Sequence, residues 1–224
     1  IIAITGSCGK TSLKELLGNI FGKISKVSYS PKSYNNKYGV PLSIFNINKH
    51  DDFNIFEIGM DKKGEIDLLS KIIKPDVGVI TNISYAHAKN FKNLNQIADA
   101  KSEIINNINS NGSIVLNADD FFFKKHKRIA LNKNLKIYSF SLRKPNTNVC
   151  IKKIIKLKNK YKILINVNKK QKIFFIKSIF ESNLKNMLAA LAVISIFKNV
   201  NKLNQNIFYN FSNLKGRGDI SKIK

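Results

Sequence analysis

The sequence is short of several kinds of residue, and each shortage excludes a class of protein. Its two cysteines, Cys8 and Cys150, are too few for a disulfide framework and lack metal-ligand spacing, so we expect a reduced, cytoplasmic protein. No apolar run approaches the roughly 18 residues of a membrane span. The N-terminal residues have no signal-peptide pattern, and because Ile1 is not Met we expect a piece of a longer protein.

Acidic residues are also scarce, with 14 Asp and Glu against 39 Lys and Arg and a formal net charge of +25. Clustered lysines would indicate nucleic-acid binding, because they neutralise phosphates. Here the lysines are spread along the chain, densest from Lys152 to Lys177, without an aromatic-interleaved recognition motif. The charge therefore favours a biased composition with anionic substrates, and a basic nucleic-acid-binding ATPase stays an alternative.

What the sequence does contain is 43% hydrophobic residues in 224, enough to bury a sizeable core. In the first part, β-rich runs alternate with amphipathic helical patterns, which predicts an α/β fold with a mostly parallel sheet flanked by helices. The expected strands are Ile1–Thr5, Val27–Tyr29, Phe53–Ile58, Val77–Thr81 and Ser113–Leu116, and the expected helices include Leu13–Phe21, Ile66–Ile73 and Ile97–Ile108. Such sheets bind ligands at the carboxyl ends of their strands.

The pattern changes after Ser139. The runs Cys150–Leu157, Tyr161–Val167 and Lys172–Ile176, separated by Asn- and Lys-rich turns, predict a small antiparallel meander attached to the parallel sheet. A helix should follow with an apolar stripe made of Leu184, Met187, Leu188, Leu191 and Ile194. Another helix is expected near Leu203–Phe211. Because no repeat or linker interrupts the chain, we predict a single domain over residues 1–224.

The sharpest local signal lies between the first predicted strand and the first helix: Thr5-Gly6-Ser7-Cys8-Gly9-Lys10-Thr11. Glycines let backbone N–H groups turn towards a phosphate, and the helix N-terminus adds the positive end of its dipole. Lys10 would contact the outer phosphates, and the Thr11 hydroxyl would hold Mg²⁺. The general NTPase pattern needs a glycine where Ile4 stands, so a generic NTPase is less favoured. Cys8 occupies a variable position and indicates packing rather than chemistry.

Two residues further along stand out on physical grounds. Glu57 ends a predicted buried strand at the edge where the ligand crevice opens, and a carboxylate there suits Mg²⁺; a surface residue is the alternative. Lys101 falls on an apolar helical stripe with Leu94, Ile97, Ile104, Ile105 and Ile108. A lysine there snorkels, pairs or is chemically changed, because desolvation lowers its pKa from about 10.4 and favours the neutral amine. A neutral amine can capture CO₂ as a carbamate.

The loop T-G-S-x-G-K-T resembles that of the Mur ligase family, and further stretches occur in the order shown by the family members that add D-alanyl-D-alanine. They are Asn35-Asn36-Lys37-Tyr38-Gly39-Val40-Pro41-Leu42, Phe56-Glu57-Ile58-Gly59-Met60 with Gly64-Glu65-Ile66, Lys74-Pro75-Asp76, Ile80-Thr81-Asn82-Ile83 with His87, and Ile97 to Ile104 around Lys101. The Lys14-Glu15 pair supports this branch. Later matches are Asn117-Ala118-Asp119-Asp120, Asn183-Leu184-Lys185-Asn186 and Leu214-Lys215-Gly216-Arg217, although Ser182 replaces a family histidine.

The resemblance implies an ATP-dependent amide ligase of peptidoglycan precursor synthesis. ATP would phosphorylate a carboxylate of UDP-N-acetylmuramoyl-tripeptide, and D-alanyl-D-alanine would attack the acyl phosphate. It implies nucleotide contacts from Thr5, Gly6, Ser7, Cys8, Gly9, Lys10, Thr11, Asn183, Asn186 and Arg217, and catalytic roles for Lys10, Lys101 and His87. Two Mg²⁺ ions would be held by Thr11 and by Glu57, His87 and carbamylated Lys101.

Some alternatives stay open beside that reading. A lone histidine such as His87 is usually structural or at the surface, Ser182 or Asn183 suits an ordinary helix N-cap, and Arg217 suits a solvated position. The family also includes folylpolyglutamate synthase, which would use a pterin-glutamate acceptor. Family members carry one domain before this one and one after it, so we expect this fragment to turn over little alone. We also expect a monomer.

Overall fold

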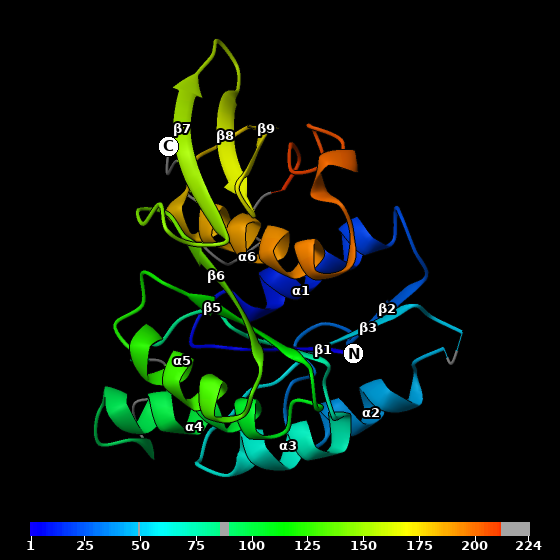
Figure 1. Ribbon diagram of the computed structural model, residues 1–224. Coiled ribbons are helices and arrows are strands. Elements are labelled where there is room, and N and C mark those ends of the chain that lie inside the picture. The colour runs from blue at the N-terminus through cyan, green and yellow to red at the C-terminus, as the bar shows by residue number, and fades with distance from the viewer. Residues whose placement is uncertain (49, 86–89, 212–224) are drawn as a thin grey trace, which may run out of the picture.

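A nine-stranded sheet runs through the computed structural model, which describes residues 1–48, 50–85 and 90–211 (Figure 1). The strand order is β2-β3-β1-β4-β5-β6-β7-β8-β9. The strands are β1 (Ile2–Thr5), β2 (Val27–Tyr29), β3 (Phe53–Glu57), β4 (Val77–Ile80), β5 (Ser113–Asn117), β6 (Lys136–Ser141), β7 (Val149–Lys156), β8 (Tyr161–Val167) and β9 (Lys170–Ile176). Neighbours from β2 to β7 pair in parallel, whereas β8 pairs antiparallel with β7 and β9. The predicted α/β fold with its meander is confirmed.

Helices cover both faces of the sheet, as Figure 1 shows. One face carries α1 (Lys10–Phe21) and α6 (Glu181–Phe197), and the other carries α2 (Gly39–Phe45), α3 (Glu65–Ile73), α4 (Leu94–Asn106) and α5 (Phe123–Asn132). Successive side chains of β1 point to opposite faces of the sheet. Ile2 and Ile4 belong to the hydrophobic cluster under α1 and α6, and Ala3 belongs to the cluster on the other face. The central strands are therefore apolar on both faces.

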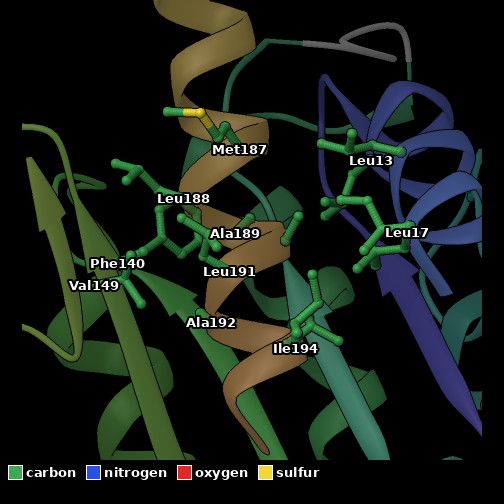
Figure 2. Packing of buried hydrophobic residues seen from close by; sticks show 14 of the residues in the cluster. Leu13, Leu17, Phe140, Val149, Met187, Leu188, Ala189, Leu191, Ala192 and Ile194 are labelled. Atoms are coloured by element: carbon green, nitrogen blue, oxygen red, sulfur yellow. The ribbon is translucent and has the colours of Figure 1, made fainter. Parts of the chain in front are cut away.

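Helix α6 is buried along most of its length. Its residues from Leu184 to Ile194 are almost all buried, because α1 lies on one side of it and the bases of β6 and β7 on another. Figure 2 shows Leu13 and Leu17 of α1 facing α6 from one side, and Phe140 and Val149 from the other. A helix apolar around most of its circumference is expected where neighbours cover it on several sides.

The predicted helix near Leu203–Phe211 is wrong. The chain there forms a 3₁₀ turn, η2 (Val200–Lys202), followed by turns whose N–H groups bond three residues back, as from Ile207 to Asn204. The Asn204 side chain accepts the N–H of Asn206 at 2.8 Å. Asparagine side chains compete in this way with helical hydrogen bonds, so an apolar pattern rich in asparagine did not become a helix.

Three elements were not predicted. The strand β6 continues the parallel series before the meander begins, α5 is so rich in lysine that it buries only His126 and Ala130, and α2 carries Pro41 in its first turn. A proline is tolerated there because the first N–H groups of a helix lack intrahelical partners. In the described parts of the chain, no helix combines the length and the apolar character that crossing a membrane requires.

Candidate active site

The predicted site begins at the carboxyl ends of the central strands β1, β3 and β4. The parallel register sets Ile4 beside Glu57 and Thr5 beside Ile80, so the phosphate loop, Glu57 and the segment after β4 leave the sheet at one edge. Thr5 is fully buried, and its hydroxyl has no hydrogen-bond partner among the described residues. This edge is where a parallel sheet binds ligands.

Both glycines of the phosphate loop are required by geometry. Gly6 has φ +144° and Gly9 has φ +84°, a region that residues with a Cβ rarely adopt. A Cβ on Gly6 would lie 1.9 Å from the hydroxyl oxygen of Thr81, and one on Gly9 would lie 2.8 Å from Oδ1 of Asn186. Since α1 begins at Lys10 immediately after Gly9, the loop ends at a helix N-terminus, as predicted.

The segment after β4 holds the phosphate loop in place. The Ser7 N–H donates to the Asn82 carbonyl at 2.9 Å, and the Cys8 N–H donates to Oδ1 of Asn82 at 2.9 Å. The Thr81 hydroxyl donates to the Cys8 carbonyl at 2.6 Å, and the Ser7 hydroxyl exchanges two hydrogen bonds with the backbone of Ser84. These positioning roles of Thr81, Asn82 and Ser84 could not be read from the sequence.

Residues Asn117 to Asp120 support this segment. Asn117 Nδ2 donates to the Thr81 carbonyl at 3.2 Å, and Oδ2 of Asp120 accepts the Ile83 N–H at 2.7 Å. Lys10 lies over the loop itself, where its ammonium donates to the Gly6 carbonyl at 2.9 Å. Thr11, the predicted metal-holding residue of α1, is 4% exposed.

Glu57 is buried at the end of β3 and is only 1% exposed, so the alternative of a surface residue is wrong. Its Oε1 accepts a hydrogen bond of 2.7 Å from Asn35 Nδ2, and its N–H donates to the Ser30 hydroxyl at 3.3 Å. Its Oε2 is buried with no hydrogen-bond partner among the described residues. A buried, unpartnered carboxylate oxygen is unfavourable unless a cation faces it, which fits a Mg²⁺ ligand. The sequence offered no separate role for Asn35.

Lys101 lies on the buried face of α4, between Ile97 and Ile104, and is 1% exposed. It therefore does not snorkel to solvent. Burial, and then repulsion from Lys10, lower the pKa of its ammonium from the ordinary 10.5 to about 7, against a smaller attraction from Cys8. The repulsion shows that the Lys101 ammonium lies within electrostatic range of Lys10 in the phosphate loop, and its burial on the apolar stripe agrees with the prediction from helical spacing.

The metal site is only partly within the described residues. His87 lies outside them, as does Arg217. No cluster of three or more His, Cys, Asp or Glu side chains suited to a metal exists in the described part of the chain. Of the predicted ligands, Glu57 is the carboxylate that the described residues include, and Thr11 and Lys101 are the other predicted ligands among them.

The start of α6 borders the other side of the phosphate loop. Asn183 and Asn186 are both 5% exposed, and Oδ1 of Asn183 is buried without a hydrogen-bond partner among the described residues. A small cavity of about 40 Å³ lies between α6 and the loop. It is lined by Cys8, Gly9, Thr81, Asn82, Phe140, Ser182, Lys185, Asn186 and Ala189. Lys185, which the sequence did not single out, pairs with Glu181 at 2.6 Å. The N-cap of α6 is Phe180, so the N-cap alternative for Ser182 and Asn183 is wrong.

A larger cavity of about 550 Å³ opens beside Lys10. It is lined by Lys10, Asn35, Asn36, Lys37, Tyr38, Gly59, Met60, Asp61, Glu65, Leu68 and Leu69. Its polar residues come from the start of α1, the stretch around Asn35, the loop after Glu57 and the start of α3. The phosphate loop therefore has one cavity beside Gly9 and α6 and another beside Lys10 and Asn35.

Comparison with known proteins agrees with this geometry. The Mur ligase middle domain matches residues 4–194. The UDP-N-acetylmuramoyl-tripeptide–D-alanyl-D-alanine ligase of Buchnera aphidicola subsp. Acyrthosiphon pisum is 35% identical over 150 residues, which are 67% of this chain and 33% of that protein.

Solved structures extend the match over nearly the whole chain. MurF from Acinetobacter baumannii superposes with a TM-score of 0.88 at 29% identity, covering 99% of this chain and 48% of that one. A MurF ligase from Thermotoga maritima in complex with ADP has a TM-score of 0.83 at 24% identity, covering all of this chain and 51% of that one, which shows the fold. The chain thus spans about half the length of these solved relatives. It belongs to the Mur ligase family, as a middle domain.

Proposed function

We propose that the protein carrying this domain is an ATP-dependent ligase that adds D-alanyl-D-alanine to UDP-N-acetylmuramoyl-tripeptide during peptidoglycan precursor synthesis. The observation that carries the proposal is that the phosphate loop and the buried, unpartnered Glu57 oxygen leave the sheet at one edge, with the buried Lys101 amine in electrostatic range of Lys10. The curated relative bearing this activity supports the choice of substrates. A cytoplasmic setting and a monomeric state stay predictions.

The phosphate loop would bind the ATP phosphates. Its backbone N–H groups and the N-terminus of α1 attract anionic oxygens, and Lys10 would exchange its carbonyl contacts for the outer phosphates. On the other side of Gly9, the amides of Asn183 and Asn186 would contact adenine, since an amide both donates and accepts hydrogen bonds. Arg217 would contact phosphate or ribose, and Ser182 leaves one family contact missing.

Two Mg²⁺ ions would be held by Thr11 and by Glu57, His87 and Lys101, and when bound they supply positive charge against the transferring phosphoryl oxygens. Glu57 is oriented for this by Asn35, which occupies Oε1 and leaves Oε2 for a cation. Lys101 would join as a carbamate: its neutral amine attacks CO₂, forms an N–C bond and loses a proton. The carbamate anion would attract the Lys10 ammonium, whereas the unmodified Lys101 ammonium repels it.

The cavity beside Lys10 and Asn35 would receive the carboxylate of the tripeptide. Transfer of the γ-phosphoryl group from ATP to this carboxylate would form an acyl phosphate and ADP. The amine of D-alanyl-D-alanine would then attack the acyl carbon, and phosphate would leave from the tetrahedral intermediate. Lys10 would stabilise the charge that develops on the transferring oxygens.

The test is ADP formation by the full-length protein with defined substrates. We expect ADP release to require both UDP-N-acetylmuramoyl-tripeptide and D-alanyl-D-alanine, and to remain at background with folate and glutamate. Release that depends instead on folate would assign a folylpolyglutamate synthase. Release stimulated by DNA or RNA and lost steeply with salt would assign a nucleic-acid-dependent ATPase. We expect the 224-residue chain alone to bind ATP–Mg²⁺ weakly and to form almost no product.

A further inference from the structure

Lys14 is a charged residue buried within α1, one turn beyond Lys10. Its side chain is 0% exposed, and its ammonium donates to the carbonyl of Ser30 at 2.6 Å and to the carbonyl of Lys32. It also pairs with Glu15 at 3.1 Å. Burying an ammonium is costly unless its donors are satisfied, and here two of its three N–H groups are committed to the backbone of one segment.

That segment, residues 30 to 35, turns sharply and then reaches Glu57. Lys32 has φ +47°, in the left-handed region, so the turn depends on outside contacts to keep its shape. The Ser30 N–H donates to the Ile55 carbonyl at 3.0 Å, and the Ser30 hydroxyl accepts the N–H of Glu57 at 3.3 Å. The beginning of the segment is therefore attached both to Lys14 and to the end of β3.

The far end of the segment contacts the Glu57 carboxylate directly. Asn35 Nδ2 donates to Oε1 of Glu57 at 2.7 Å, and the Asn35 carbonyl accepts the Gly59 N–H at 2.7 Å. The direction of Oε2, the unpartnered oxygen, thus depends on where residues 30 to 35 lie. Through these two hydrogen bonds Lys14 connects the segment to α1, the helix that bears Lys10 and Thr11.

We infer that Lys14 is a positioning residue: through Ser30, Lys32 and Asn35 it sets the orientation of the Glu57 carboxylate and hence the affinity of the site for Mg²⁺. The inference rests on the proposed function for the role of Glu57. Groups that orient a metal ligand without touching the metal commonly change its affinity by about 10- to 100-fold when removed. Lys14 would fix the position of α1, which bears Lys10 and Thr11, relative to the end of β3, which bears Glu57.

The test compares three variants of the full-length protein. Lys14→Met keeps the length of the side chain but removes its donors, Lys14→Arg keeps donors for both carbonyls, and Leu17→Ala is the matched control. Leu17 is also 0% exposed on α1, and shortening it destabilises the fold without touching segment 30 to 35. Binding of Mn²⁺ in the presence of a non-hydrolysable ATP analogue is measured by electron paramagnetic resonance, and ADP formation is titrated with Mg²⁺.

We expect Lys14→Met to weaken Mn²⁺ binding and raise the half-saturating Mg²⁺ concentration by about tenfold, with kcat recovering at saturating Mg²⁺. Lys14→Arg should restore most of the affinity, and Leu17→Ala should leave it unchanged. Wild-type Mn²⁺ affinity in folded Lys14→Met, or equal weakening in Leu17→Ala, overturns the inference. Should Lys14→Met not fold, Lys14→Gln decides, because its amide is shorter and can donate to only part of this backbone: a roughly threefold loss of Mn²⁺ affinity supports the inference, and wild-type affinity overturns it.

These outcomes are separable from failure of the proposed function. A protein that binds Mn²⁺ with the nucleotide but ignores UDP-N-acetylmuramoyl-tripeptide would refute the proposed substrates. The Mn²⁺ affinities of the Lys14 variants would still decide the positioning role.

Discussion

Replacing Lys101 by methionine should make the domain more stable at neutral pH. Methionine has nearly the same length and no charge, so it fits the apolar stripe that holds Lys101 on α4. The wild-type ammonium has a pKa lowered from 10.5 to about 7. Because one pKa unit corresponds to about 1.36 kcal/mol, holding this ammonium charged inside the fold costs roughly 5 kcal/mol.

The sign of the pH dependence follows from which state binds the proton. Between the two pKa values the unfolded chain is protonated at Lys101 and the folded chain is not, so wild-type stability falls as the pH falls from 10.5 towards 7. The advantage of Lys101→Met should therefore be about 4 kcal/mol at pH 7, about 2 kcal/mol at pH 9 and small near pH 10.5. Below pH 7 it should level off.

Urea unfolding of the 224-residue chain in CO₂-free buffer at pH 7, 8 and 9 measures this difference. Lys127→Met, which removes an exposed lysine of α5, is the matched control and should change the free energy of unfolding little at any of these pH values. A Lys101→Met variant no more stable than wild type at pH 7, or an advantage that does not shrink as the pH rises, would refute the reasoning. Such a result would mean that the folded chain holds Lys101 in its charged form without loss of stability.

If Lys101 forms a carbamate, bicarbonate should raise the free energy of unfolding. A ligand that binds only the folded chain stabilises it by RT ln(1 + [L]/Kd), or about 1.4 kcal/mol at ten times the half-saturating concentration. Bicarbonate should therefore stabilise the wild-type chain, and it should leave Lys101→Met unchanged because that variant has no amine at this position. Equal stabilisation of both by bicarbonate would be a salt effect and would count against the carbamate.

The remaining predictions concern the loop, the metal and a buried histidine. Gly9→Ala should weaken ATP binding by at least about tenfold in calorimetry, since φ +84° and the nearby Asn186 amide leave no place for a methyl group. Glu57→Gln should raise the Mg²⁺ concentration needed for ADP formation by about tenfold or more while the fold is kept, and an unchanged Mg²⁺ titration would exclude Glu57 as a ligand. Burial lowers the pKa of His126, so stability should fall as the pH drops through 6.5, and His126→Leu should flatten that loss in acid unfolding curves.

Features carried by neighbouring residues could be predicted from the sequence. The phosphate loop is a stretch of seven residues between a strand and a helix, so its pattern is visible in the sequence. Gly6 and Gly9 have the backbone conformations that the motif requires. The burial of Lys101 followed from helical spacing alone, because α4 repeats its apolar face every three or four residues. Glu57 was placed correctly because a buried strand must end at a sheet edge.

The partners of those residues were decided only by the tertiary structure. Asn35 meets Glu57 across 22 positions, Lys14 meets Ser30 across 16, and Asn82 meets Cys8 across 74. Such contacts depend on strand order and register, since β1 lies between β3 and β4 although β2 follows it in the chain. Sequence spacing therefore predicted the phosphate-loop turn and the burial of Glu57 and Lys101, whereas the packing of non-adjacent strands determined which groups contact them.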